Sequence, residues 1–297
     1  MENLFVNTTL LNESFIFDSD SFLSWYEYHI KVKFTMHVVT CIIIGIGLPL
    51  MLMAIYALCS LVKNDHVAPI YIINLFISDF IQLCCMIIWE SEPEEHMIKI
   101  IVDSIYKFGL LTSVGFMVCI SLERYLIIAH PLWYHFRRSI RISVAVCVVV
   151  WIISLVFNLA VLPWVTLFVE QIILSFFLIT PLPLFIFFLV GTLRALSTSV
   201  SVPSNEKRRI VAILVLVLLI YTLLFLPCII LFTTAAYIHD DTLYDLSFMF
   251  LKLSPLADLL LYFFIRMETV SKLWTSVCCC RKENNDTNFN TLNLADI

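Results

Sequence analysis

The sequence predicts an all-α membrane protein: a seven-transmembrane helix bundle followed by a short amphipathic helix on the membrane surface. Hydrophobic residues make up 61% of its 297 residues and charged residues 14%, whereas soluble domains carry about 45–50% and about 25%. Seven apolar stretches are long enough to cross a bilayer, which takes about 20 residues in a helix. Helices satisfy their own backbone groups in hydrocarbon, so each stretch is predicted as one helix.

The seven predicted spans are separated by short polar breaks, such as Lys63-Asn64-Asp65-His66 between the first two. The region after the seventh span, 266–274, is amphipathic and predicts a helix lying on the membrane. We therefore expect an N-terminal tail at 1–33, a transmembrane domain at 34–265, and a surface helix with a cytoplasmic tail at 266–297. In chain order, the spans are 36–61, 69–89, 97–128, 142–162, 172–193, 210–236 and 243–265.

Charge is segregated between the two sides of these spans. Lys and Arg mark cytoplasmic loops, which places the N-terminus outside and the C-terminus inside a multi-pass protein of the plasma membrane. The net charge of −5 then carries no indication of nucleic acid binding, and no nucleic acid partner is expected. The basic residues on the cytoplasmic side include Lys63, Arg137, Arg138, Arg141, Arg194, Lys207, Arg208, Arg209, Arg266 and Lys272.

Two kinds of modification fit this orientation. Asn7 and Asn12 begin Asn-x-Ser/Thr acceptors for glycosylation in the outer tail, although such triplets also arise by chance. Cys278, Cys279 and Cys280 lie among basic residues near the membrane. They predict S-palmitoylation and contact with membrane lipids, the alternative being ordinary reduced thiols.

Glu123-Arg124-Tyr125 closes the third span and is followed by His130-Pro131-Leu132. A charged side chain at the edge of a lipid-buried helix is expensive and usually functional. The alternative is that Arg124 only extends its guanidinium to the interface.

At this position in a seven-span chain, the triplet resembles the cytoplasmic switch of the class A (rhodopsin-like) G-protein-coupled receptors. The resemblance covers the chain beyond the N-terminal tail and implies that a heterotrimeric G protein binds near Arg124. It extends to the Asn74…Asp79 pattern, Trp151, Phe225-Leu226-Pro227 and Asp258…Tyr262. The coupling residues that it implies are Glu123, Arg124, Tyr125, Pro131, Leu132, Lys207 and Tyr262.

The chain also departs from the family pattern. Lys207 stands where the family has an acid that holds Arg124 at rest, so we expect ligand-independent activity. Lys99 stands at the third-span cysteine position, and no cysteine lies between Cys147 and Cys228, so no outer disulfide is expected. Met51, Leu259 and Gly191 replace other family residues and leave open a receptor-like protein with weak or no signalling.

Asp79 and Asp258 form a second group, because the second and seventh spans pack together in the resembled family, with Ser113 nearby. Two carboxylates in a dry core cannot both ionise cheaply. They can share a proton or hold a sodium ion near Asp79, or they form a fixed polar network. No other cofactor is expected, and the residues show no metal-ligand cluster, phosphate loop or nucleophile–base arrangement that would indicate an enzyme.

The outer half of the bundle carries the predicted ligand pocket. Lysines 107 and 252 would attract an acidic group, and aromatic residues suit the rest of a small acidic amphipathic ligand. Asp103 could instead pair with a lysine without any ligand. Lys252 also stands where opsins carry their retinal lysine. The pocket residues predicted are Asp103, Tyr106, Lys107, Phe225 and Lys252.

Gly47-Leu48-Pro49 and Asp258 further resemble the branch of proton-sensing, lysolipid and oxidised-fatty-acid receptors. Histidine titrates in the physiological range, so protons are a second expected stimulus, although an exposed histidine is often only solvated. The candidates are His29, His37, His96 and His239. An ion-conducting protein that uses Asp79, Asp258 and Lys252 is a further alternative, against which the lack of inverted repeats argues.

Overall fold

The computed structural model describes residues 2–63, 70–91, 93–130, 140–160, 164–198, 204–238 and 241–263, almost entirely as helices. In the parts it describes, seven helical segments combine the length and the hydropathy that a membrane crossing requires. The helices are α1 (Glu2–Lys63), α2 (Ile70–Glu90), α3 (His96–Ala129), α5 (Ile140–Ala160), α6 (Leu167–Ile179), α7 (Pro181–Thr198), α8 (Ser204–Ile238) and α9 (Asp241–Lys252).

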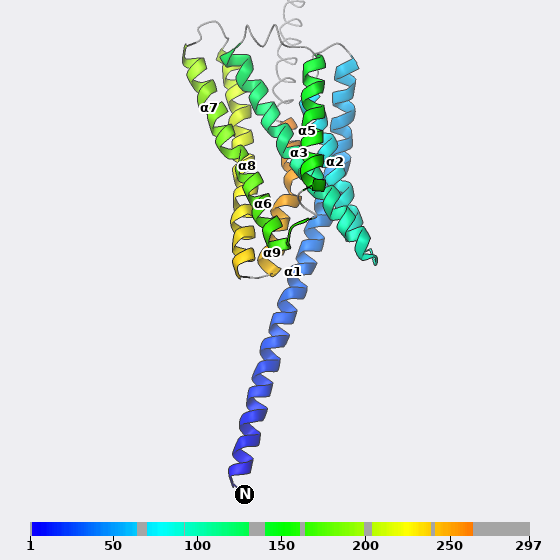
Figure 1. The fold of residues 1–297 in the computed structure, drawn as a ribbon, viewed down its shortest axis with the longest axis vertical. Helices are drawn as coiled ribbons and strands as arrows, with labels where there is room; N and C mark the ends of the chain where they lie inside the picture. The colour runs from blue at the N-terminus through cyan, green and yellow to red at the C-terminus, as the bar shows by residue number, and fades with distance from the viewer. Residues whose placement is uncertain are drawn as a thin grey trace, which may run out of the picture.

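All seven predicted spans are found. The largest difference is at α1, which is continuous from Glu2, so no break in the helix marks the expected boundary at 33/34. Figure 1 shows its N-terminal part projecting past the end of the bundle where α6 and α9 lie.

Two spans are interrupted where the sequence analysis predicted one helix. The fifth span is divided between α6 and α7, because Pro181 has no backbone N–H to continue the hydrogen-bond ladder. The seventh span turns at Leu253 just before Pro255, and the helix resumes over 254–263. This turn lies between Lys252 and Asp258.

The helices pack around α3, which contacts α2, α5 and α7, while α9 contacts α8 and closes against α1 (Figure 1). The interior is filled by large side chains that exclude solvent, among them Phe76, Phe116, Tyr221 and Phe225. Polar contacts also join helices: Trp151 Nε1 of α5 donates to Asn74 Oδ1 of α2 at 3.0 Å. The outer face of α5 is apolar and exposed, as expected for a surface that lipid covers.

Candidate functional site

The Glu123-Arg124-Tyr125 triplet lies in the last turns of α3, at the end of the bundle predicted to face the cytosol. Arg124 is half-buried. The ring of Tyr125 packs against α7, with centroid distances of 5.9 Å to Phe187 and 5.7 Å to Phe188. The triplet is therefore attached to the fifth span through its tyrosine. Of the other predicted coupling residues, Pro131, Leu132 and the Lys207 side chain lie outside what the structure describes, and Tyr262 is buried against Phe76.

Gly191 of α7 explains how Tyr125 can sit so close. A Cβ atom at this position would lie 2.6 Å from Cε2 of Tyr125, which is closer than two carbons can approach. The side chain that the resembled family carries at this position therefore cannot coexist with Tyr125 in its observed place. The absence of a side chain at Gly191 therefore makes room for the Tyr125 ring.

We expect Gly191→Val to push the Tyr125 ring off α7 and to lower the free energy of unfolding by about 1–3 kcal/mol, the usual range for an overpacked site. Thermal unfolding of the purified protein measures this. Gly45→Val is the matched control, because nothing lies within 4 Å of a Cβ atom at Gly45. Adding Tyr125→Leu should recover most of the loss, and equal stability of the two glycine variants would contradict the steric account.

The structure brings Asp79, Ser113 and Asp258 together in the middle of the bundle. They come from α2, α3 and the helix after Leu253, and all three are buried. Ser113 Oγ donates to Asp258 Oδ2 at 3.2 Å, and Gln82 Nε2 donates to Asp79 Oδ1 at 3.2 Å. Asp79 Oδ2, Asp258 Oδ1 and Gln82 Oε1 have no hydrogen-bond partner within the described part of the chain. The predicted polar core is thus an observed cluster, with three oxygens available for a proton or a cation.

In the outer half, Lys252 faces the end of α2. Its Nζ lies 3.6 Å from Glu90 Oε1 and donates to Thr40 Oγ1 of α1 at 3.1 Å. It also lies 5.7 Å from the centre of the Trp89 ring, which makes a cation–π contact. The partner of Lys252 is therefore Glu90 and not Asp103.

Asp103 instead pairs with Lys107 one turn further along α3, and Lys107 also binds Glu170 of α6. Lys107 and Glu170 are both buried, so this pair joins the third span to the fifth away from solvent. In these contacts three carboxylates (Glu90, Asp103 and Glu170) face two ammonium groups.

Aromatic rings surround these charges. Tyr106 lies 4.9 Å from Trp89 and 6.2 Å from Phe248, measured between ring centroids. The Tyr106 hydroxyl is buried and has no hydrogen-bond partner in the part of the chain that the structure describes. Phe225 belongs to the same hydrophobic core, and its ring centroid lies 4.4 Å from that of Tyr221, with the two rings tilted by 30°.

The histidines separate into different environments. His37 of α1 contacts Glu90 Oε2, the oxygen that Lys252 does not approach. His96 is exposed at the start of α3 and His29 is half-buried, whereas His239 falls outside the described residues. Asn7, Asn12, the three tail cysteines and the surface helix at 266–274 also fall outside them or lack a described side chain.

The sequence analysis missed Glu90, Glu170, Trp89 and Thr40 as members of these contacts. One usable signal was present for Glu170, because a lone acid at the edge of an apolar span needs a partner. Thr40 carries no such signal, since threonine hydroxyls in helices usually bond to their own backbone, as this one does to Met36.

Comparison with known proteins matches residues 50–171 to the family described as 7 transmembrane receptor (rhodopsin family). G-protein coupled receptor 68 of Homo sapiens is 28% identical over 122 residues, which are 38% of this chain and 33% of that protein. Mas-related G-protein coupled receptor member X1 of Homo sapiens is 31% identical over 131 residues, 42% of this chain and 39% of that protein.

The type-1 angiotensin II receptor of Meriones unguiculatus is 31% identical over 109 residues, 34% of this chain and 29% of that protein. Each match spans between roughly three and four tenths of the relative's length. The family match over residues 50–171 includes Asp79, Ser113, Arg124 and Trp151. All three relatives are named as receptors and not as enzymes.

Proposed function

Because the chain belongs to the rhodopsin family of seven-transmembrane receptors, we propose that it carries an extracellular signal to a heterotrimeric G protein at the plasma membrane. One observation carries the proposal. Arg124 lies half-buried at the predicted cytoplasmic end of α3, in a seven-helix bundle, beside a tyrosine packed on the fifth span. A rearrangement of the fifth and sixth spans would move Tyr125 and expose Arg124 to a bound partner.

Guanine-nucleotide exchange is the activity that tests this function. The receptor is purified, placed in lipid nanodiscs and mixed with G protein, and nucleotide exchange is compared with that in empty nanodiscs. Ion flux through liposomes tests the alternative of an ion-conducting protein. Ion flux without nucleotide exchange would indicate a channel and not a receptor. The absence of both activities would favour a receptor-like protein that does not signal.

The polar core is the proposed link between the outer and cytoplasmic halves. It joins α2, α3 and the seventh span, and its carboxyl groups are buried with one oxygen each left without a partner. A sodium ion suits this set, since carboxylate and amide oxygens are the ligands of hard cations. Asp79, Asp258 and Gln82 would hold the ion, whose single positive charge would offset one of the two carboxylate charges. A shared proton would offset the same single charge.

If the Asp79–Asp258 pair takes up a proton during signalling, the exchange activity should change as the pH is lowered from about 8 to about 6. This pH range brackets the ordinary pKa of histidine. Asp79→Asn removes one of the two coupled groups and should flatten at least about half of that change, because the titration belongs to the pair. His96→Asn is the control for exposed histidines and should leave the profile intact. A flat wild-type profile would contradict protons as a stimulus. A profile that is unchanged in Asp79→Asn would mean that the proton acts at a group outside the polar core.

The proposed small ligand is an acidic amphipathic molecule that lies against the Trp89 and Tyr106 rings with its anionic group on Lys252. Lys252 is held by Glu90, so the ligand must take the place of the Glu90 carboxylate. Glu90 therefore competes with the ligand for the ammonium group of Lys252.

Glu90→Gln should therefore tighten the binding of lysophosphatidic acid by about 10-fold, since it removes a competing charge-assisted contact. Lys252→Ala should weaken binding by a similar factor, measured by ligand-induced thermal stabilisation. Lys99→Ala removes an exposed lysine of α3 and serves as the control. Full affinity in Lys252→Ala, or no gain in Glu90→Gln, would remove Lys252 as the anchor.

A further inference from the structure

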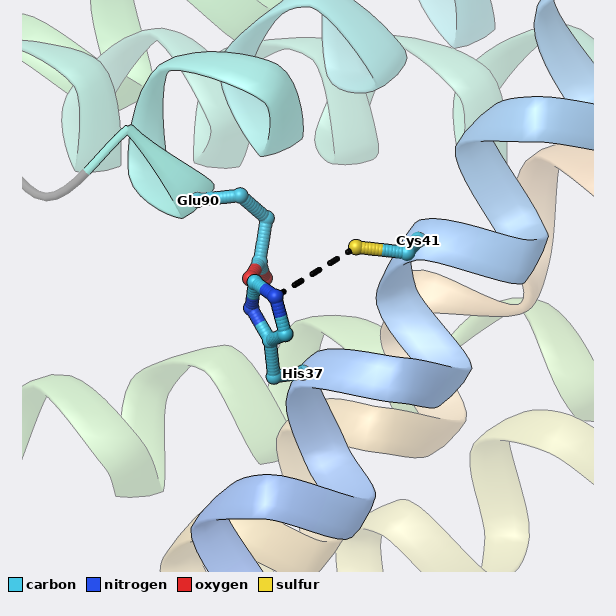
Figure 2. A group of neighbouring side chains, drawn as sticks. All are labelled: His37, Cys41 and Glu90. Carbon is cyan, nitrogen blue, oxygen red and sulfur yellow. Dashed lines mark hydrogen bonds and ion pairs between the residues drawn. The ribbon is translucent and has the colours of Figure 1, made fainter.

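Three side chains with different ligand atoms meet at the outer edge of the bundle, between α1 and α2. His37 and Cys41 are one turn apart on α1, and Glu90 is the last residue of α2. Figure 2 shows the imidazole between the other two groups, with the dashed line joining it to Cys41. Cys41 Sγ lies 3.7 Å from His37 Nε2, and Glu90 Oε2 contacts His37 Nδ1. One ligand atom from each residue falls within 4.8 Å of the others.

This set of a nitrogen, a sulfur and an oxygen atom indicates a particular metal. Thiolate and imidazole ligands suit Zn²⁺, whereas Ca²⁺ and Mg²⁺ take oxygen ligands. Ligand atoms around one tetrahedral Zn²⁺ ion lie about 3.3–3.8 Å apart, given bonds of about 2.0–2.3 Å. The observed separations are at most 4.8 Å, so binding would shorten the longest of them by about 1 Å. Since one ion uses one ring nitrogen, a turn of the His37 side chain would supply this change.

Lys252 orients one of the three ligands. Its Nζ lies 3.6 Å from Glu90 Oε1, which leaves Glu90 Oε2 toward His37. His37 has 53% of its side chain exposed, which gives an ion a path into the site.

We propose that His37, Cys41 and Glu90 bind a Zn²⁺ ion, with a water molecule or a further ligand in the fourth position. That the ion reaches the site from outside the cell rests on the proposed function and its orientation. Lys252 and the ion then compete for the same carboxylate. Metal binding draws Glu90 toward α1 and weakens its hold on the seventh span, which places the site in a position to regulate the bundle.

Cobalt binding tests the site without any signalling readout, because Co²⁺ bound to a thiolate has a charge-transfer absorption in the near ultraviolet. We expect this absorption in the full-length protein in nanodiscs and its loss when Zn²⁺ is added. Cys41→Ser should abolish it. His37→Asn and Glu90→Gln should weaken Zn²⁺ binding by at least about 10-fold, since even outer-shell changes cost about 10–100-fold.

Two controls and one opposite variant sharpen the test. Cys59→Ser removes another exposed cysteine of α1, and His96→Asn removes an exposed histidine, and neither should change the absorption. Lys252→Met should tighten Zn²⁺ binding by about 5-fold, because it removes a cation close to the metal site. Thermal unfolding of each variant shows that it is folded.

Absorption that persists in Cys41→Ser, or affinities that do not change in folded His37→Asn and Glu90→Gln, would overturn the metal site. The result is independent of the receptor function. Metal binding without nucleotide exchange would keep the site and remove the proposed function, and exchange without metal binding would do the reverse.

Discussion

Arg124→Ala is expected to reduce receptor-catalysed nucleotide exchange by about 10-fold or more, within the usual range of coupling between two sites. The guanidinium is the charged group at the end of α3 that a G protein would meet once the bundle opens. Exchange without added ligand should fall as well, since Lys207 stands where an acid would hold Arg124 at rest. Fluorescent-nucleotide exchange on reconstituted receptor measures both values.

Arg141→Ala provides the matched control. Arg141 is an exposed cation near the same end of the bundle, at the start of α5, so its loss tests for a general effect of charge. Exchange should stay within about 2-fold of wild type, as for surface substitutions with small energetic effects. If Arg124→Ala and Arg141→Ala behave alike in folded protein, the triplet is not the coupling switch.

Lys107→Met should destabilise the bundle by about 3 kcal/mol or more, the cost of removing one partner from a buried ion pair. The substitution leaves Glu170 buried without its cation, and it cuts the tie between α3 and α6. Thermal unfolding and hydrogen exchange of α6 measure the two effects separately.

The double variant Lys107→Met/Glu170→Gln should recover most of the lost stability, because a neutral amide costs much less to bury than a lone carboxylate. Lys99→Met changes an exposed lysine of the same helix and should shift stability by less than about 0.5 kcal/mol. A Lys107→Met protein as stable as wild type would mean that the buried pair does not hold α3 to α6.

The spans could be predicted closely from the sequence because lipid imposes both the length and the polarity of each helix. The ends of 69–89 and Ile70–Glu90 differ by one residue at each end. The breaks at Pro181 and Leu253 were harder to place, since a proline in a membrane helix either kinks it or ends it depending on its neighbours. The polar core was predicted from a resemblance, and in the structure Ser113 Oγ lies 3.2 Å from Asp258 Oδ2.

Asp103 and Lys107 share α3, but the other outer polar contacts could not be predicted, because each joins residues on different helices. Lys107 and Glu170 are 63 residues apart, and Lys252 and Thr40 are 212 apart. Such contacts depend on how each helix is tilted and rotated about its axis, which apolar runs do not specify. The proposed metal-binding set could not be predicted for the same reason, although His37 and Cys41 share a helix face at a spacing of four residues. The sequence does not indicate that Glu90 faces α1.

The most direct measurement is nucleotide exchange by the unmodified receptor in nanodiscs, tested against a panel of G-protein classes without added ligand. The proposed function predicts that at least one class exchanges nucleotide faster than it does with empty nanodiscs, and that the excess is lost with Arg124→Ala. No acceleration in any class, with lysophosphatidic acid and at both about pH 8 and about pH 6, would contradict it.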